Sequence, residues 1–211
     1  MSTTPKSNGP HYSIPDPKIL SSASSLQVLA EDNTPHAFSS LPIPTQQTLI
    51  VFIRHFYCGY CEDYVRALAT QLPPSRLSTT TPPTTLKIIG CGQPTVVADY
   101  KRRTNCPFEI YCDPTRALYK KLGMMCSLEL GPKPGYAEGG ALGRTWASMC
   151  TLLGSGIKGL KGGGAYDQNG GEWVFGADGE LKWCRRMRNT RDHAEIKELE
   201  EVLELKGVEK D

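Results

Sequence analysis

The feature that most constrains the fold is an apolar run that leads into two closely spaced cysteines and then into a helical pattern. The run, TLIVFI over residues 48–53, is short and continuous, as expected of a strand that is buried on both faces. Cys58 and Cys61 follow it. Apolar residues then recur at the i, i+3, i+4 and i+7 spacing of one helix face: Val65, Leu68, Ala69 and Leu72. Pro73-Pro74 ends this helical pattern. Since the thiols lie between the apolar run and the helical pattern, we expect them at the join between a buried strand and a helix.

Strand-like and helix-like segments continue to alternate along the chain. Residues 86–92 and 108–112 are predicted strands, and helices are expected over about 95–103 and 113–122. Such alternation is typical of a parallel sheet core with right-handed crossovers. The sequence therefore predicts an α/β fold with a central mixed sheet flanked by helices.

The C-terminal part is predicted to hold a hairpin and a helix. In EWVFGADGELKWC, residues 172–184, the turn dipeptide Asp178-Gly179 separates two strand-like runs. A last helix is expected from about Asp192, with four apolar residues on one face: Ile196, Leu199, Val202 and Leu203. Both elements complete the α/β pattern after a long irregular region.

That irregular region, residues 124–171, is predicted to be a glycine-rich insertion before the hairpin. Thirteen of the 21 glycines lie between positions 131 and 171, and glycine is costly to order, so we expect the insertion to be mobile and to border the thiols. Within it, residues 146–153 are compatible with a short amphipathic helix. The insertion belongs to one domain over residues 26–206.

The chain ends are predicted to lie outside this domain. Residues 1–25 are rich in Ser, Pro, Thr and Lys, so we expect a disordered or loosely attached arm, and residues 207–211 form a tail. The N-terminus lacks the apolar region of a secretory signal, and the sequence holds no apolar stretch of about 18 residues. We therefore expect a cytoplasmic protein without a membrane partner.

The composition argues against a nucleic-acid-binding protein and against a disulfide-stabilised scaffold. A net charge of +2 carries no nucleic-acid signal, and 211 residues with 39% hydrophobic content can build a full core. The eight cysteines are therefore expected to be mostly reduced thiols rather than a disulfide scaffold. Cys91, Cys112 and Cys184 are predicted core residues, whereas Cys106, Cys126 and Cys150 stay open as second resolving thiols.

Cys58 and Cys61 have a spacing that suits redox chemistry. The unpaired N–H groups and the positive dipole end of a helix favour a thiolate, which lowers a cysteine pKa. We expect Cys58, at the helix cap, to be the exposed nucleophile and Cys61, one turn in, to resolve the intermediate by closing a disulfide. Two alternatives stay open: a pair of core cysteines, and half of a zinc site that lacks its second half.

Five further residues are candidates for binding substrate or stabilising the thiolate: His55, Tyr60, Gly170, Gly171 and Arg185. Arg185 would serve this role if the arginines after the hairpin face the thiols; a solvated turn is the other reading. The glycine pair would let a substrate backbone approach closely. His55 and His193 have a structural role as the default interpretation.

Four segments together resemble the peroxiredoxin-like proteins with an AhpC/TSA antioxidant-enzyme domain, in the thioredoxin-like branch related to the peroxiredoxin-like 2 proteins. They are RHFYCGYC, EIYCDPTRALYKKLGM, QNGGEWVFGADGEL and RRMRNTRDH. The resemblance, which covers about residues 26–206, implies a thioredoxin-like fold with the site at the first helix N-terminus. It also implies an antioxidant oxidoreductase with a redox-active disulfide, no resident cofactor, and an external reductant such as thioredoxin or glutathione.

The chain departs from two family patterns. Peroxiredoxins carry Thr-x-x-Cys at this helix, and superposition would put Cys58 in the Thr place and Cys61 in the attacking place. Thioredoxins instead use the first cysteine, which is Cys58, and that is the assignment we expect. Thioredoxins also place a cis-proline before the hairpin, where this chain has residues 168–171, QNGG.

Three functions stay open at this point. The first is reduction of a peroxide or a disulfide, in a small molecule or a protein, through Cys58 and Cys61. The second is an enzyme that acts on a small molecule of a natural-product pathway, with the insertion forming its pocket. The third is a non-catalytic binding module. The oligomeric state also stays open, a homodimer included.

Overall fold

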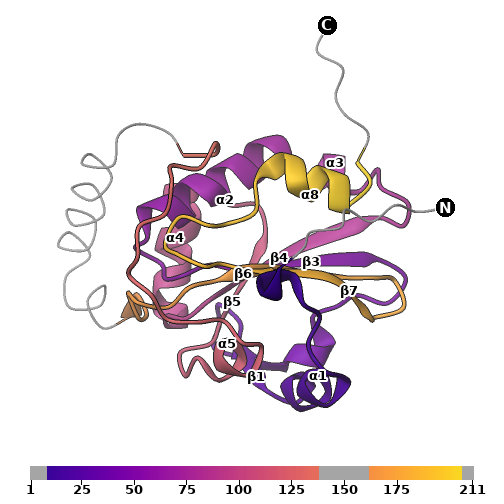
Figure 1. Cartoon of the computed structure of the whole chain (residues 1–211), viewed down its shortest axis with the longest axis horizontal. Helices are drawn as coiled ribbons and strands as arrows, with labels where there is room; N and C mark the ends of the chain where they lie inside the picture. Colours follow the sequence, from indigo (N-terminus) through magenta and orange to yellow (C-terminus); the bar gives the residue numbers. More distant parts are fainter. Residues whose placement is uncertain (1–8, 138–161, 206–211) are drawn as a thin grey trace, which may run out of the picture.

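The computed structural model describes residues 9–137 and 162–205, and in these ranges a seven-stranded mixed sheet has helices on both faces (Figure 1). The strands lie in the order β2-β1-β5-β4-β3-β6-β7. Their bounds are β1 (Gln27–Leu29), β2 (Pro35–Ala37), β3 (Gln47–Phe52), β4 (Thr84–Gly90), β5 (Glu109–Cys112), β6 (Gly171–Phe175) and β7 (Leu181–Arg186).

The α-helices of the described ranges are α1 (Pro17–Ser24), α2 (Gly59–Gln71), α3 (Pro74–Leu77), α4 (Val97–Thr104), α5 (Ala117–Lys121) and α8 (Ile196–Val202). Short 3-10 helices are η1 (Pro10–Tyr12), η2 (Phe38–Ser40) and η3 (Pro94–Val96). None of the described helices is long and apolar enough to cross a membrane.

The centre of the sheet is parallel, as the alternation of strands and helices predicted. β3 pairs in parallel with β4, and β4 pairs in parallel with β5. β6 lies antiparallel on the other side of β3 and continues into β7. The predicted mixed α/β sheet is therefore confirmed, with β3 inside it between β4 and β6 and with α2 following β3 in the chain.

Strand β3 supplies side chains to both faces of the sheet. Leu49, Val51 and Ile53 belong to a core that includes side chains of α2, α4 and α8. Ile50 and Phe52 belong to a second core that includes side chains of α1 and α5. Figure 1 shows these two groups of helices on opposite sides of the sheet. Burial of each such side chain stabilises the fold by about 1.5–3 kcal/mol, so β3 anchors both layers.

The N-terminal segment differs from the expected loose arm where it is described. Asp16 caps α1 by accepting a hydrogen bond from the Lys18 amide at 2.8 Å, and Ala23 is fully buried. Tyr12 lies against Trp183 and donates to Glu198 Oε1 at 2.8 Å. The polar composition was misleading, because one cap and a few buried contacts are enough to fix this segment. Residues 1–8 lie outside the described ranges.

The predicted hairpin is confirmed as β6 and β7, with Gly179 at a φ of 78° in its turn. That positive φ is a conformation that glycine adopts without strain. The last helix begins at Ile196, later than the expected Asp192. Glu195 is its extended N-cap, and the Asp192 carboxylate before it binds Arg185 and Arg188. The helix expected within residues 146–153 lies outside the described residues.

Candidate functional site

The two thiols lie where β3 leaves the sheet and α2 begins. Cys58 is the N-cap of α2, and its sulfur accepts a hydrogen bond from the Cys61 amide at 3.4 Å. This places Cys58 at the end of the helix where unpaired N–H groups favour a negative charge. The predicted strand–thiol–helix arrangement is confirmed.

Cys58 is only 4% exposed, so the expectation of an exposed thiol was wrong. Tyr57, in the loop before α2, belongs with Tyr136 and Ala137 to the same hydrophobic core as both thiols. Cys61, one helical turn in, is 0% exposed. Both sulfurs are therefore shielded from water, which strengthens every charge and hydrogen bond around them.

Arg54, the residue that follows Ile53 at the end of β3, contacts both sulfurs. Its Nη1 donates to Cys58 Sγ at 3.4 Å, and its backbone amide donates to Cys61 Sγ at 3.4 Å. The guanidinium is held by the carbonyls of Tyr166 and Gln168, with Nε 3.2 Å from the latter. The described end of the glycine-rich insertion thus borders the thiols, as expected, and it fixes the arginine.

The two thiols differ in acidity. A hydrogen bond from the Cys61 thiol, together with Arg54 and the Cys61 amide, outweighs burial and lowers the pKa of Cys58 to about 6. Burial and the neighbouring Cys58 sulfur raise the pKa of Cys61 well above its usual value. The surroundings therefore favour a thiolate at Cys58 and a protonated thiol at Cys61.

His193 lies on the other side of Cys61. Its Nε2 is 3.5 Å from Cys61 Sγ, and its Nδ1 is 2.6 Å from Glu172 Oε1 on β6. The imidazole also stacks on the Tyr64 ring, with centroids 4.3 Å apart and planes 10° from parallel. The sequence suggested only a structural role for His193, whereas in the structure this residue also contacts a thiol directly.

Two further residues predicted from the sequence, His55 and Tyr60, contact aromatic and charged side chains near the site. His55 is buried against the Tyr166 ring, and burial lowers its pKa to about 3, so it is neutral at physiological pH. The Tyr60 ring stacks with the Arg191 guanidinium at 4.6 Å. The roles of both residues in substrate binding stay predictions.

Arg185 and the glycine pair are positioned by the protein itself. The Arg185 guanidinium binds the Asp192 carboxylate and the Tyr12 hydroxyl, so the arginine at the Cys58 sulfur is Arg54 instead. A Cβ on Gly170 would lie 1.8 Å from the Phe52 carbonyl oxygen, and one on Gly171 would lie 2.3 Å from that of Arg185. The close approach expected of a substrate is therefore made by neighbouring strands.

Sequence reasoning missed three residues: Arg54, Glu172 and His193. Arg54 and Glu172 each carried a signal, since each is a charged residue beside or inside an apolar strand. Such a residue is rarely buried unless it is paired. His193 carried none, because 132 positions separate it from Cys61.

The other described cysteines differ in burial, and a role of Cys106 or Cys126 as a second resolving thiol stays a prediction. Cys91, Cys112 and Cys184 are buried, as predicted, and burial raises the pKa of all three. Cys106 is buried too, Cys126 is exposed, and Cys150 lies outside the described residues.

In the described ranges, no group of three or more His, Cys, Asp or Glu residues is placed to hold a metal ion.

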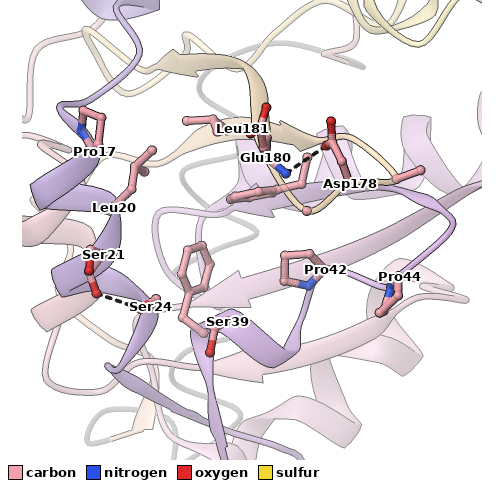
Figure 2. A pocket seen from close by; sticks show the side chains of 14 residues that line it. Pro17, Leu20, Ser21, Ser24, Ser39, Pro42, Pro44, Asp178, Glu180 and Leu181 are labelled. Atoms are coloured by element: carbon pink, nitrogen blue, oxygen red, sulfur yellow. Dashed lines mark hydrogen bonds between the residues drawn. The ribbon is translucent and has the colours of Figure 1, made fainter.

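A pocket of about 620 Å³ lies on the opposite face of the sheet, between α1, η2 and the β6–β7 turn (Figure 2). Its lining includes Leu20, Phe38, Pro42 and Phe175, with Asp178 and Glu180 at the turn. Figure 2 shows side chains of these segments around the hollow. Neither thiol lines this pocket, so its volume does not mark the site of the thiol chemistry.

Comparison with known proteins points to one family. A family model described as AhpC/TSA antioxidant enzyme matches residues 68–189, which begins after the two thiols. Peroxiredoxin-like 2C of Homo sapiens is 31% identical over 167 residues, covering 78% of this chain and 70% of its own length. Peroxiredoxin-like 2C of Bos taurus is 29% identical over 194 residues, covering 90% and 81%. These two alignments are long enough to extend well beyond the matched region.

Solved structures share the fold at low sequence identity. A peroxiredoxin-like protein from Aquifex aeolicus superposes with a TM-score of 0.53 at 12% identity, covering 85% of this chain and 82% of its own. Peroxidoxin BcpB from Mycobacterium tuberculosis gives a TM-score of 0.51 at 11% identity, covering 86% and 94%. The predicted thioredoxin-like fold is therefore confirmed.

Proposed function

Because the chain belongs to the AhpC/TSA antioxidant enzyme family, we propose that it is a thiol-dependent oxidoreductase that reduces a peroxide or a disulfide through Cys58 and Cys61. One observation carries this proposal. The Cys58 sulfur accepts hydrogen bonds from Arg54 and from the Cys61 amide, and its pKa is lowered while that of Cys61 is raised. One attacking thiolate beside one protonated partner is the division of labour that thiol exchange needs.

The first half of the reaction oxidises Cys58. With a hydroperoxide, the Cys58 thiolate attacks one oxygen, the O–O bond breaks, and the alkoxide takes a proton and leaves as an alcohol. Cys58 is then a sulfenic acid. With a disulfide, the thiolate attacks one sulfur, the S–S bond breaks, and Cys58 is left in a mixed disulfide while the second thiolate leaves. The Arg54 guanidinium stabilises the sulfur charge before the attack.

The second half closes the Cys58–Cys61 disulfide. The Cys61 sulfur attacks Cys58 Sγ, and the group bound to Cys58 leaves as water or as a thiol after it takes a proton. The two cysteines have then supplied two electrons to the substrate. An external dithiol or a pair of monothiols, of the thioredoxin or glutathione class, returns both cysteines to thiols.

The test follows the tryptic peptide of residues 55–66, HFYCGYCEDYVR, which carries both thiols and no other cysteine. A hydroperoxide, glutathione disulfide and a protein disulfide are each supplied with a thioredoxin or glutathione reducing system. We expect turnover with at least one of them. After a single addition of that oxidant without reductant, the peptide should lose two hydrogen atoms in mass.

Cys91 is the matched internal control. It is 2% exposed, close to the value for Cys58, but burial raises its pKa to about 11. At pH 7 a thiol-alkylating reagent should therefore label Cys58 quickly and Cys91 slowly. A 55–66 peptide that stays fully reduced while other cysteines oxidise would remove the redox pair from consideration.

A further inference from the structure

Three buried groups from three parts of the chain form a connected row: Cys61 on α2, His193 before α8 and Glu172 on β6. The side chains of His193 and Glu172 are both 0% exposed. An imidazole and a carboxyl group lose much of their hydration at such a place, and an apolar pair would fill the same space at lower cost. The burial of these two polar groups beside a thiol therefore needs a chemical explanation.

The hydrogen bond to Glu172 sets which nitrogen of His193 carries the proton. A carboxylate only accepts hydrogen bonds, so the 2.6 Å contact requires a proton on Nδ1. In the neutral ring, Nε2 then has a free lone pair, and that atom is the one 3.5 Å from Cys61 Sγ. Stacking on Tyr64 holds the ring plane in this orientation.

The positive charge of Arg185, on the neighbouring strand of the hairpin, attracts a negative charge on Glu172. Arg185 is its paired residue in β7, and the attraction between the two raises the pKa of the Arg185 guanidinium. The titratable or charged groups nearest His193 on the elements around it are Cys61 and Tyr64 of α2, Glu172 of β6, Arg185 of β7, Tyr136, Cys58, and Asp192 next to it in sequence. The carboxylate, rather than a positive charge, is therefore the direct neighbour of the imidazole.

The resolving step needs a base at this place. Cys61 must become a thiolate to attack Cys58, yet it is fully buried and its pKa is raised. Resting on the function proposed above, we propose that His193 is the general base that takes the proton from Cys61 in the resolving step, and that Glu172 is the positioning residue that holds His193 for it. General bases of this kind contribute about 100-fold to 10,000-fold to a rate.

The step balances without another reactant. Nε2 of His193 takes the S–H proton of Cys61, the Cys61–Cys58 S–S bond forms, and the bond from Cys58 to the substrate sulfur or oxygen breaks. The leaving thiolate or hydroxide takes the proton from the imidazolium, so His193 ends neutral. Glu172 stabilises the imidazolium while it exists and does not change its own protonation.

The test separates the two halves with an aromatic disulfide, 5,5′-dithiobis(2-nitrobenzoic acid), whose thiolate is coloured. Cys126 and Cys150 are replaced by serine in every variant, so that the fast colour comes from the pair. Attack by Cys58 releases the first thiolate and resolution by Cys61 releases the second. We expect His193→Gln to keep the first rate within about threefold at pH 7 and to slow the second by about 100-fold.

The pH profile excludes a purely structural role. The deficit of His193→Gln in the second rate should shrink as pH rises, because Cys61 then loses its proton without a base. Glu172→Gln keeps the size of the side chain but removes its charge, and we expect a smaller loss in the second rate. A scaffold defect would instead slow both releases at every pH and lower the melting temperature.

Two failures can be told apart. If the parent protein releases only the first thiolate, or none, then the proposed function fails. If the parent releases both and His193→Gln releases the second at the parent rate over the whole pH range, then only the role of His193 is overturned.

Discussion

The two faces of the sheet are built from alternate residues of the same strands, yet they bury different things. The face under α2 and α8 encloses a guanidinium, two thiols, an imidazole and a carboxyl group, each in contact with the next. The face under α1 and α5 is mainly apolar, and its buried Tyr119 hydroxyl lies within hydrogen-bond distance of the carbonyl oxygens of Ile53 and Ile89. It also carries the 620 Å³ pocket. Because of these buried ionisable groups, we place the proposed thiol chemistry on the face under α2 and α8 rather than at the pocket.

The largest expected effect comes from the thiols on the first face. Cys58→Ser should lose all turnover, because burial raises the pKa of the other buried cysteines in the described ranges. Cys61→Ser should still attack once and then accumulate a mixed disulfide or a sulfenic acid at Cys58. Intact-protein mass and a turnover assay check both variants. The reverse pattern, with Cys61→Ser unable to attack, would assign the nucleophile to Cys61.

The second face should affect stability without affecting the thiols. Phe38 packs against Phe52 and Phe175, with ring centroids 6.3 Å and 5.8 Å away, and it is buried. Phe38→Ala should lower the free energy of unfolding by about 3–5 kcal/mol, measured with a denaturant. The alkylation rate of Cys58 in the folded variant should equal that of the parent. A changed rate would show that the two faces are not independent.

Arg54→Gln tests the electrostatics of the first face. Loss of the guanidinium should raise the pKa of Cys58 by about one unit and lower its thiolate fraction at pH 7 by about twofold. In the parent, the alkylation rate should fall as pH drops through about 6, because the thiolate takes up a proton there. In the variant, this fall should begin at a higher pH. An identical pH profile would show that the Cys61 hydrogen bonds alone hold the charge.

The smallest expected effect concerns the described start of the insertion. The secondary structure of residues 124–137 is limited to turns and an isolated bridge between Cys126 and Gln168, so most of their amides should exchange with solvent faster than those of β3. Hydrogen exchange measured by mass spectrometry checks this. Protection equal to that of residues 48–53 would mean that the thiol face has a rigid border.

The sequence predicted the layers of this fold because its local signals were strong. The apolar run before Cys58, the helical spacing after it and the Asp178-Gly179 turn are each decided by neighbouring residues. The loose arm was wrong over residues 9–25, since composition does not report a cap or a few buried contacts. Local pattern therefore predicts elements better than it predicts attachment.

The site was predictable only in part for a related reason. Cys58 and Cys61 are close in sequence, so their spacing indicates their contact. The groups around them come from distant segments: the Gln168 carbonyl that holds Arg54 lies 114 positions away from it. From the sequence, Arg185 was the arginine proposed to stabilise the thiolate; in the structure Arg185 binds Asp192, and Arg54 donates to the Cys58 sulfur.

The separation of Cys61 and His193 by 132 positions has a consequence for the protein during its synthesis. Cys58 and Cys61 leave the ribosome together, long before His193 and the Gln168 carbonyl that holds Arg54. A nascent chain therefore carries the two thiols without the contacts that set them apart in acidity. The difference in acidity between Cys58 and Cys61 is therefore complete only after His193 has been translated and β6 has joined the sheet.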